Sequence, residues 1–76
     1  IARLGTGPRV LALDAHLDTV DMGDRANWTF DPLSGEVRDG WVLGRGSVDQ
    51  KGGAAAMITA GRILREIGLG DRLTLV

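Results

Sequence analysis

The feature of the sequence that most constrains the fold is an apolar run at residues 10–13, which ends in a short polar motif. The run is continuous rather than alternating, a pattern typical of a strand buried on both faces in a sheet covered by helices. The motif contains His16, the single histidine of the chain, and Asp18. Residues two apart in a strand point to the same face. We therefore expect His16 and Asp18 to project together from the end of a buried strand at residues 9–15, where sites in open α/β sheets usually open.

A long loop and a hairpin are predicted after this strand. Residues 21–34 show no useful periodicity and are rich in Asp, Gly, Asn and Pro, which is typical of a loop. Trp28 and Phe30 need a packing surface, so we expect this loop to fold back near the strand end. Asp39-Gly40 is a strong two-residue turn signal between two short apolar stretches, and it predicts a β-hairpin at residues 35–43.

A helix and a further strand complete the predicted order. Apolar residues at helical spacing predict a helix at residues 51–67, with Met57, Gly61 and Leu64 on one face. Two glycines shortly after residue 67 are typical of a helix end. Residues 72–76 predict another buried strand. Strand, long loop, hairpin, helix and strand in this order indicate an α/β fold.

Composition excludes several classes of protein. A chain of 76 residues forms one domain at most, and we expect it to be a fragment of a longer protein, because both ends look cut. There is no cysteine and hence no disulfide framework, which fits a reducing compartment and leads us to expect a cytoplasmic protein. A net charge of −1 gives no electrostatic reason to expect nucleic acid or a membrane surface as partner. No apolar run approaches the ~18 residues of a transmembrane helix.

A glycine-rich stretch at residues 44–53 is a candidate to form a site together with the motif that contains His16 and Asp18. It presents Asp49 at the start of the predicted helix, where an aspartate either caps the helix or offers its carboxylate to a cation. His16 and Asp18 likewise have an ordinary structural interpretation, as a surface histidine and a strand-end cap. Residues 44–53 do not match a phosphate-binding Walker loop, despite Arg45 and Lys51. A metal site that joins both stretches is the functional alternative.

Taken together, these motifs resemble a known family. The pattern runs in order through His16-Leu17-Asp18-Thr19-Val20, Trp28, Asp31-Pro32, Asp39-Gly40 and Gly44-Arg45-Gly46-Ser47-Val48-Asp49-Gln50-Lys51-Gly52. It resembles the dizinc metallopeptidases and deacylases, which include aminoacylase, acetylornithine deacetylase, succinyl-diaminopimelate desuccinylase and carboxypeptidase G-type enzymes. The resemblance covers about two thirds of the chain, roughly residues 10–60. Each motif is weak alone, but their order and spacing together are specific.

The resemblance implies a role for three residues. His16 corresponds to a terminal ligand of one zinc ion, and Asp49 corresponds to the carboxylate that bridges two zinc ions. Asp18 corresponds to the catalytic-site aspartate that orients the histidine. The family also has a cis peptide bond after the bridging aspartate, so Asp49-Gln50 is expected to be cis. Most members have methionine where this chain has Gln50, which is a departure from the pattern.

The implied activity belongs to a larger protein. The resemblance implies zinc-dependent hydrolysis of a peptide or N-acyl amide bond in a small substrate, such as a peptide or an N-acyl amino acid. Cobalt or manganese compete for the same ligands. The family's glutamate pair, its remaining ligands and its dimerisation domain do not lie within residues 1–76, so the resemblance implies part of a mixed-sheet catalytic domain that is inactive alone and whose parent is a homodimer. The alternative is a non-catalytic α/β binding or structural module.

Overall fold

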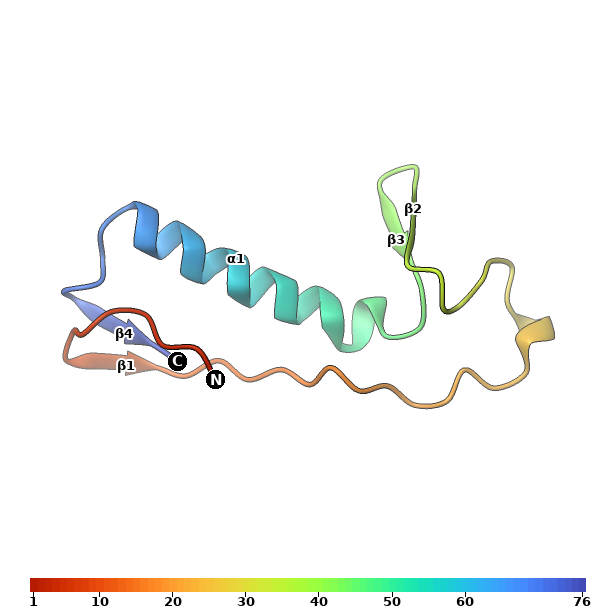
Figure 1. The fold of residues 1–76 in the computed structure, drawn as a ribbon, viewed down its shortest axis with the longest axis horizontal. Coiled ribbons are helices and arrows are strands. Elements are labelled where there is room, and N and C mark those ends of the chain that lie inside the picture. Colours follow the sequence, from red (N-terminus) through yellow and green to blue (C-terminus); the bar gives the residue numbers. More distant parts are fainter.

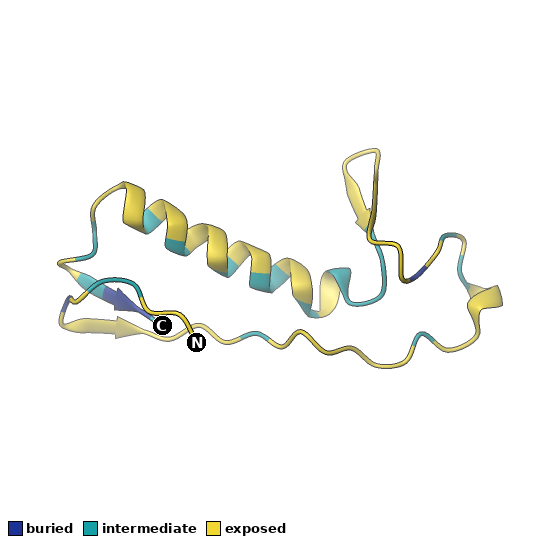
Figure 2. Ribbon diagram, in the orientation of Figure 1, coloured by how far each residue is buried: buried dark blue, intermediate teal, exposed yellow.

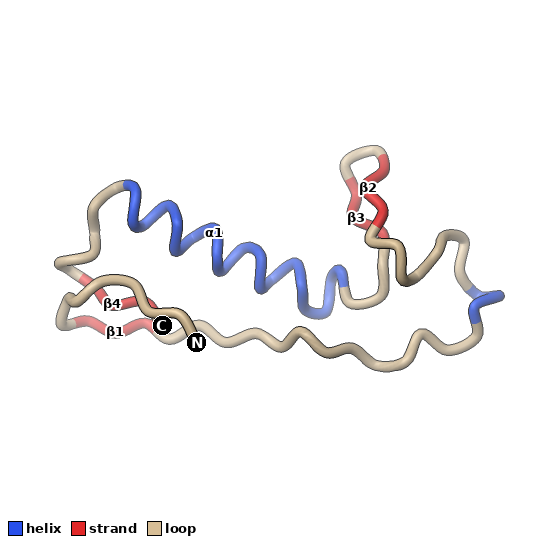
Figure 3. The backbone as a smooth tube through the Cα atoms, viewed as in Figure 1, coloured by secondary structure: helices blue, strands red, loops and turns tan.

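The computed structural model describes all residues 1–76 and contains one α-helix, four short strands and two short helical turns (Figures 1 and 3). In chain order these are β1 (Arg9–Leu11), η1 (Arg25–Asn27), β2 (Glu36–Arg38), β3 (Trp41–Leu43), η2 (Ser47–Gly52), α1 (Gly53–Glu66) and β4 (Leu73–Leu75). The predicted α/β order is therefore confirmed. None of the helices combines the length and the apolarity needed to span a membrane.

β4 has a hydrogen-bonded neighbour on each of its edges. It pairs in parallel with β1, and Val10 lies opposite Thr74 in this register. The pairing extends past the end of β1, because Leu13 N–H donates to the Val76 carbonyl over 2.7 Å. On the other edge of β4, Leu4 and Leu75 form an antiparallel bridge. Parallel and antiparallel neighbours on one strand make this sheet mixed, as the family resemblance implied.

The prediction of a strand at residues 9–15 that is buried on both faces is only partly met. β1 ends at Leu11, and its three residues are exposed, with Val10 at 65% of its full accessibility. The reason is that burial on two faces needs a layer on each face, whereas this chain supplies one helix for the whole sheet. Burial concentrates instead in β4, where Thr74 and Leu75 are buried (Figure 2).

Helix α1 matches the predicted helix, although it starts two residues later than expected. Its half-buried face includes Met57, Gly61 and Leu64, the three residues predicted to share a face. At its end, the N–H groups of Gly68 and Leu69 donate to the carbonyls of Arg65 and Leu64 over 3.3 and 3.2 Å. This pair of bonds is a Schellman motif, which satisfies the last helical carbonyls and turns the chain toward β4.

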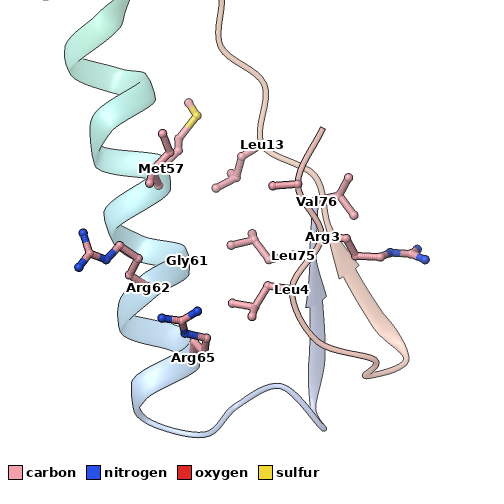
Figure 4. Close-up of a pocket in the computed structure, with 11 residues that line it drawn as sticks. Arg3, Leu4, Leu13, Met57, Gly61, Arg62, Arg65, Leu75 and Val76 are labelled. Carbon is pink, nitrogen blue, oxygen red and sulfur yellow. The ribbon is translucent and has the colours of Figure 1, made fainter.

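An apolar pocket of about 360 Å³ separates α1 from the strands (Figure 4). Leu4, Leu13 and Leu75 point toward the helix, which contributes Met57 and Gly61 on its side. The layer between helix and sheet is therefore only partly filled by this chain. The radius of gyration of 16.4 Å also exceeds the roughly 11 Å of a compact domain of this length.

The predicted hairpin is confirmed. β2 and β3 pair antiparallel, with Arg38 opposite Trp41, and Asp39 and Gly40 both have positive φ angles of 52° and 82°. Two successive positive φ angles define the tight hairpin turn whose twist matches that of paired strands. The hairpin projects away from the sheet of β1 and β4 and from α1 (Figure 1).

Gly7 lies at the closest approach between the N-terminal segment and β4. The residue is buried, and its carbonyl accepts a hydrogen bond of 2.8 Å from the Thr74 hydroxyl. A methyl group at this position would collide with the main-chain atoms of Arg72 and Leu73. Backbone atoms cannot rotate out of the way, so only glycine allows β1 to enter this register beside β4.

Gly7→Ala should therefore destabilise the protein that contains this chain. We expect the free energy of unfolding, measured by urea denaturation, to fall by roughly 1–3 kcal/mol, as for an overpacked interior. Gly70→Ala is the matched control, because a methyl group there would approach only the Cα of Gly5, at 3.6 Å. Equal unfolding free energies for the two variants would contradict the assigned close approach.

Candidate metal site

His16 lies beyond the carboxyl end of β1, on an extended segment that runs back along α1 (Figure 1). The 14 residues of α1 span about 21 Å. The extended residues from the end of β1 to His16 span about 17 Å. Because β1 and β4 are parallel, α1 must begin near the end toward which β1 points. These similar lengths place His16 level with η2, the turn that starts the helix.

The imidazole ring of His16 contacts an oxygen atom at each nitrogen. Nδ1 lies 3.0 Å from the main-chain carbonyl of Asp18 and 3.4 Å from its carboxylate. Nε2 lies 3.1 Å from Oδ1 of Asp49, a residue 33 positions later in the chain. The structure thus brings together all three residues predicted from the sequence. It places the Asp18 carbonyl nearer to the ring than the Asp18 carboxylate.

Asp49 does not act as a helix cap. Neither η2 nor α1 has a side-chain cap hydrogen bond, and the residue before α1 is Gly52. Asp49 and Gln50 have non-helical backbone angles, with φ values of −116° and −136°, and the peptide bond between them is cis, as the family resemblance implied. This irregular turn directs the Asp49 carboxylate toward His16 instead of the helix N–H groups.

Gly46 allows the turn to approach the extended segment. Its φ angle of 79° is in the left-handed region, and a methyl group on it would collide with the Thr19 side chain. The turn that carries Asp49 is therefore held directly against the segment that carries His16.

Both ring nitrogens of His16 face acceptors, which has a consequence for its charge. A neutral imidazole has one N–H and can donate to only one of the two oxygens, whereas the protonated ring donates to both. The hydrogen bond to the Asp18 carbonyl, followed by that to the Asp49 carboxylate, raises the pKa of His16 above its ordinary value of 6.5. A cation between Nε2 and Oδ1 would satisfy both atoms in place of the proton.

The two atoms fit a shared metal ion. Ligand atoms about 2.0–2.2 Å from a tetrahedral metal ion lie roughly 3.3–3.6 Å apart. The observed separation of 3.1 Å needs only a small side-chain movement to reach that distance. However, no group of three or more His, Asp or Glu side chains in this chain has metal-binding geometry. His16 and Asp49 are therefore candidates for part of a metal site.

A pocket of about 250 Å³ opens beside these two residues. Its lining includes His16, Asp18, Trp28, Arg45, Ser47 and Asp49. Trp28 belongs to the long loop at residues 21–34, so this loop folds back against the extended segment at residues 16–20. The prediction that it folds back near the strand end is met only in part, because β1 already ends at Leu11. The Arg45 guanidinium lies 4.9 Å from the centre of the Trp28 ring, and Phe30 packs edge-on against the same tryptophan.

Two contacts at the site were not predicted from the sequence. Arg45, considered above for phosphate binding, instead stacks on Trp28 and anchors the long loop. Gln50 accepts a hydrogen bond of 3.2 Å from the main-chain N–H of His16. Both contacts join an irregular loop or turn to a distant segment, and no spacing rule relates such residues in the sequence.

The raised pKa of His16 gives a pH dependence that can be measured. The contacts that raise it stabilise the folded, metal-free protein below the ordinary pKa, and this contribution is lost as the pH rises through the folded-state pKa. Asp49→Asn should lower the pKa of His16, measured by NMR titration of its ring protons, and should destabilise the protein more at acidic than at alkaline pH. Asp39→Asn, at the hairpin tip, is the control and should leave the titration unchanged.

Comparisons with known proteins place this chain in a family. The model of peptidase family M20/M25/M40 matches residues 12–76. The chain is 49% identical over 73 residues, 96% of its length, to the uncharacterised protein YgeY of Escherichia coli K12. It is 51% identical over 59 residues, 78% of its length, to succinyl-diaminopimelate desuccinylase of Methylorubrum populi. It is 47% identical over 60 residues, 79% of its length, to a probable succinyl-diaminopimelate desuccinylase of Staphylococcus epidermidis.

The matched regions are short parts of these relatives. The chain spans 18% of the length of YgeY and 15% of each of the two desuccinylases. No solved structure matches the chain significantly. The family match covers both His16 and Asp49 together with the turn and the helix that position them. The chain belongs to the peptidase family M20/M25/M40.

Proposed function

We propose that the protein containing this chain is a metal-dependent hydrolase that cleaves a peptide or N-acyl amide bond, and that residues 1–76 form part of its catalytic domain. The observation that carries the proposal is the 3.1 Å contact between His16 Nε2 and Asp49 Oδ1. It joins two segments that are far apart in the sequence at the mouth of a pocket. Membership of the peptidase family supports hydrolysis as the reaction class.

His16 and Asp49 would hold the metal, and zinc is the ion that the family resemblance favours. Imidazole nitrogen and carboxylate oxygen are both ordinary zinc ligands. When bound, the metal would polarise the scissile carbonyl group and lower the pKa of the attacking water. Since a zinc ion takes about four ligands, this chain alone would bind it weakly and would lack activity. The general base and the remaining ligands would come from parts of the protein outside residues 1–76.

Asp18 would keep His16 in the tautomer that a metal ligand needs. Its carbonyl lies 3.0 Å from Nδ1 and accepts a hydrogen bond from an N–H there, which leaves the lone pair of Nε2 free and directed toward Asp49. The carboxylate, at 3.4 Å, makes the ring more basic and stabilises positive charge on it. The side chain of Asp18 is also 90% exposed, so it can face a substrate in the pocket.

The names of two relatives support a proposal for the substrate class. One relative is named succinyl-diaminopimelate desuccinylase, and another is named a probable succinyl-diaminopimelate desuccinylase. We propose a small N-acyl amino acid or a short peptide as the substrate of this protein, and a homodimer in the cytoplasm as its working form. Hydrolysis of a panel of N-succinyl and N-acetyl amino acids and dipeptides, measured by release of the free amine, tests this proposal. Absence of hydrolysis with metal bound would favour a non-catalytic module.

Metal analysis gives a direct test of the site. The purified protein should contain up to two divalent metal ions per chain, measured by inductively coupled plasma mass spectrometry. Asp49→Ala should remove most of this metal, because it deletes the carboxylate that faces His16. Asp39→Ala removes a carboxylate at the hairpin tip and is the matched control. A metal content that is the same in both variants would exclude Asp49 as a ligand.

Asp18→Asn separates metal binding from turnover. The substitution keeps the main-chain carbonyl that fixes the ring but removes the carboxylate charge. We expect most of the metal to remain bound, while kcat falls roughly 10–100-fold, the usual effect of losing a partner of a ligating histidine. Unchanged turnover would show that the Asp18 carboxylate has no role in the reaction.

A further inference from the structure

Gln50 makes a contact at the site that is separate from the candidate metal ligands. Its side-chain Oε1 accepts a hydrogen bond of 3.2 Å from the main-chain N–H of His16. No other acceptor for this N–H group is present in the structure. Asp49 and Gln50 are consecutive, so one contacts the ring of His16 while the next contacts its main chain.

The segment that carries His16 has little else to hold it. The last main-chain hydrogen bond of the sheet runs from Leu13 N–H to Val76. From residue 14 to residue 20 the main chain has no strand partner. The contact with Gln50 is the one hydrogen bond that ties the main chain of this segment to the turn opposite.

The two contacts respond differently to a bound cation. A metal ion between Nε2 and Oδ1 replaces the direct contact between His16 and Asp49, because both atoms turn their lone pairs toward the ion. The contact from Gln50 involves the main chain of His16 and can persist unchanged. The contact from Gln50 therefore holds the main chain that carries the imidazole in the same position with and without a bound metal ion.

We propose that Gln50 is a positioning residue, which holds the main chain of His16 so that its ring faces Asp49 and a metal ion can enter between them. This inference rests on the proposed metal-dependent function. Gly53 supports it, because a methyl group there would lie only 3.3 Å from Cγ of Gln50. The slim start of α1 thus leaves room for the Gln50 side chain to reach across to His16.

Gln50→Met tests the role of the accepting oxygen. Methionine keeps the unbranched length of glutamine, but its sulfur is only a weak acceptor. We expect the affinity of the metal-free protein for zinc, measured by competition with a chromophoric chelator at pH 7.5, to fall roughly tenfold, as for other groups that orient a ligating histidine. Val48→Met is the matched control, since Val48 lies in the same turn, is 90% exposed and makes no hydrogen bond to His16.

Gln50→Glu is the conservative variant and should retain the zinc affinity that Gln50→Met loses. A carboxylate oxygen can accept the same hydrogen bond, so zinc affinity should be at least that of the unaltered protein. A general structural defect would weaken both variants alike. If Gln50→Met binds zinc as tightly as the unaltered protein, or if Gln50→Glu loses as much affinity as Gln50→Met, the positioning role is wrong.

A metal-free measurement separates this inference from the proposed function. Hydrogen exchange of the His16 amide, followed by mass spectrometry on the metal-free protein, should be about fivefold faster in Gln50→Met, as expected for loss of one hydrogen bond. Gln50→Glu should retain the slower rate. If the unaltered protein binds no zinc, the proposed function fails. The exchange rates still decide whether Gln50 holds His16, and equal rates in all three proteins would contradict it.

Discussion

The parallel pairing of β1 with β4 is the constraint on which the rest of the structure depends. Two parallel strands need a connection that returns the chain to the starting edge, and here that connection contains the long loop, the hairpin and α1. The pairing forces the start of α1 to lie near the end toward which β1 points. The residues after β1 therefore meet the turn that precedes α1, and the candidate site forms where they meet.

The close approach at Gly7 makes this pairing possible. The buried carbonyl of Gly7 binds the hydroxyl of Thr74, and the main chain on either side contacts both edges of β4. Three of the four buried residues of the chain, Gly7, Thr74 and Leu75, lie at this junction.

The site itself combines a fixed element with an adjustable one. Asp49 is fixed by an irregular turn at the start of a helix, whereas His16 lies on an extended segment beyond the sheet. An extended segment has no regular internal main-chain hydrogen bonds, so its position is set by what it contacts. Asp49 and Gln50 supply these contacts from the turn, and Asp18 contacts the other ring nitrogen of His16 from within the same segment.

Much of this arrangement could be predicted from local sequence signals. The hairpin follows from Asp39-Gly40, and the helix follows from apolar spacing and the glycines after it. The expectation that His16 and Asp49 lie together in one site rested on the order and spacing of motifs that the chain shares with a family. Burial of β1 was predicted on both faces and is not found, because continuous apolarity indicates what a strand can bury but not which layers cover it.

The sequence by itself determined the element order, the tight turns and the residue types able to bind a metal ion, because these depend on neighbouring residues and on side-chain chemistry. Tertiary structure alone decided that the Asp18 carbonyl lies closer to His16 than its carboxylate, that Arg45 stacks on Trp28, and that Gln50 holds the His16 main chain. These contacts join irregular segments distant in the chain. Their geometry depends on the pairing of the parallel strands and the position of the helix, which bring the segment after β1 against the turn before α1. Local sequence patterns do not predict this proximity.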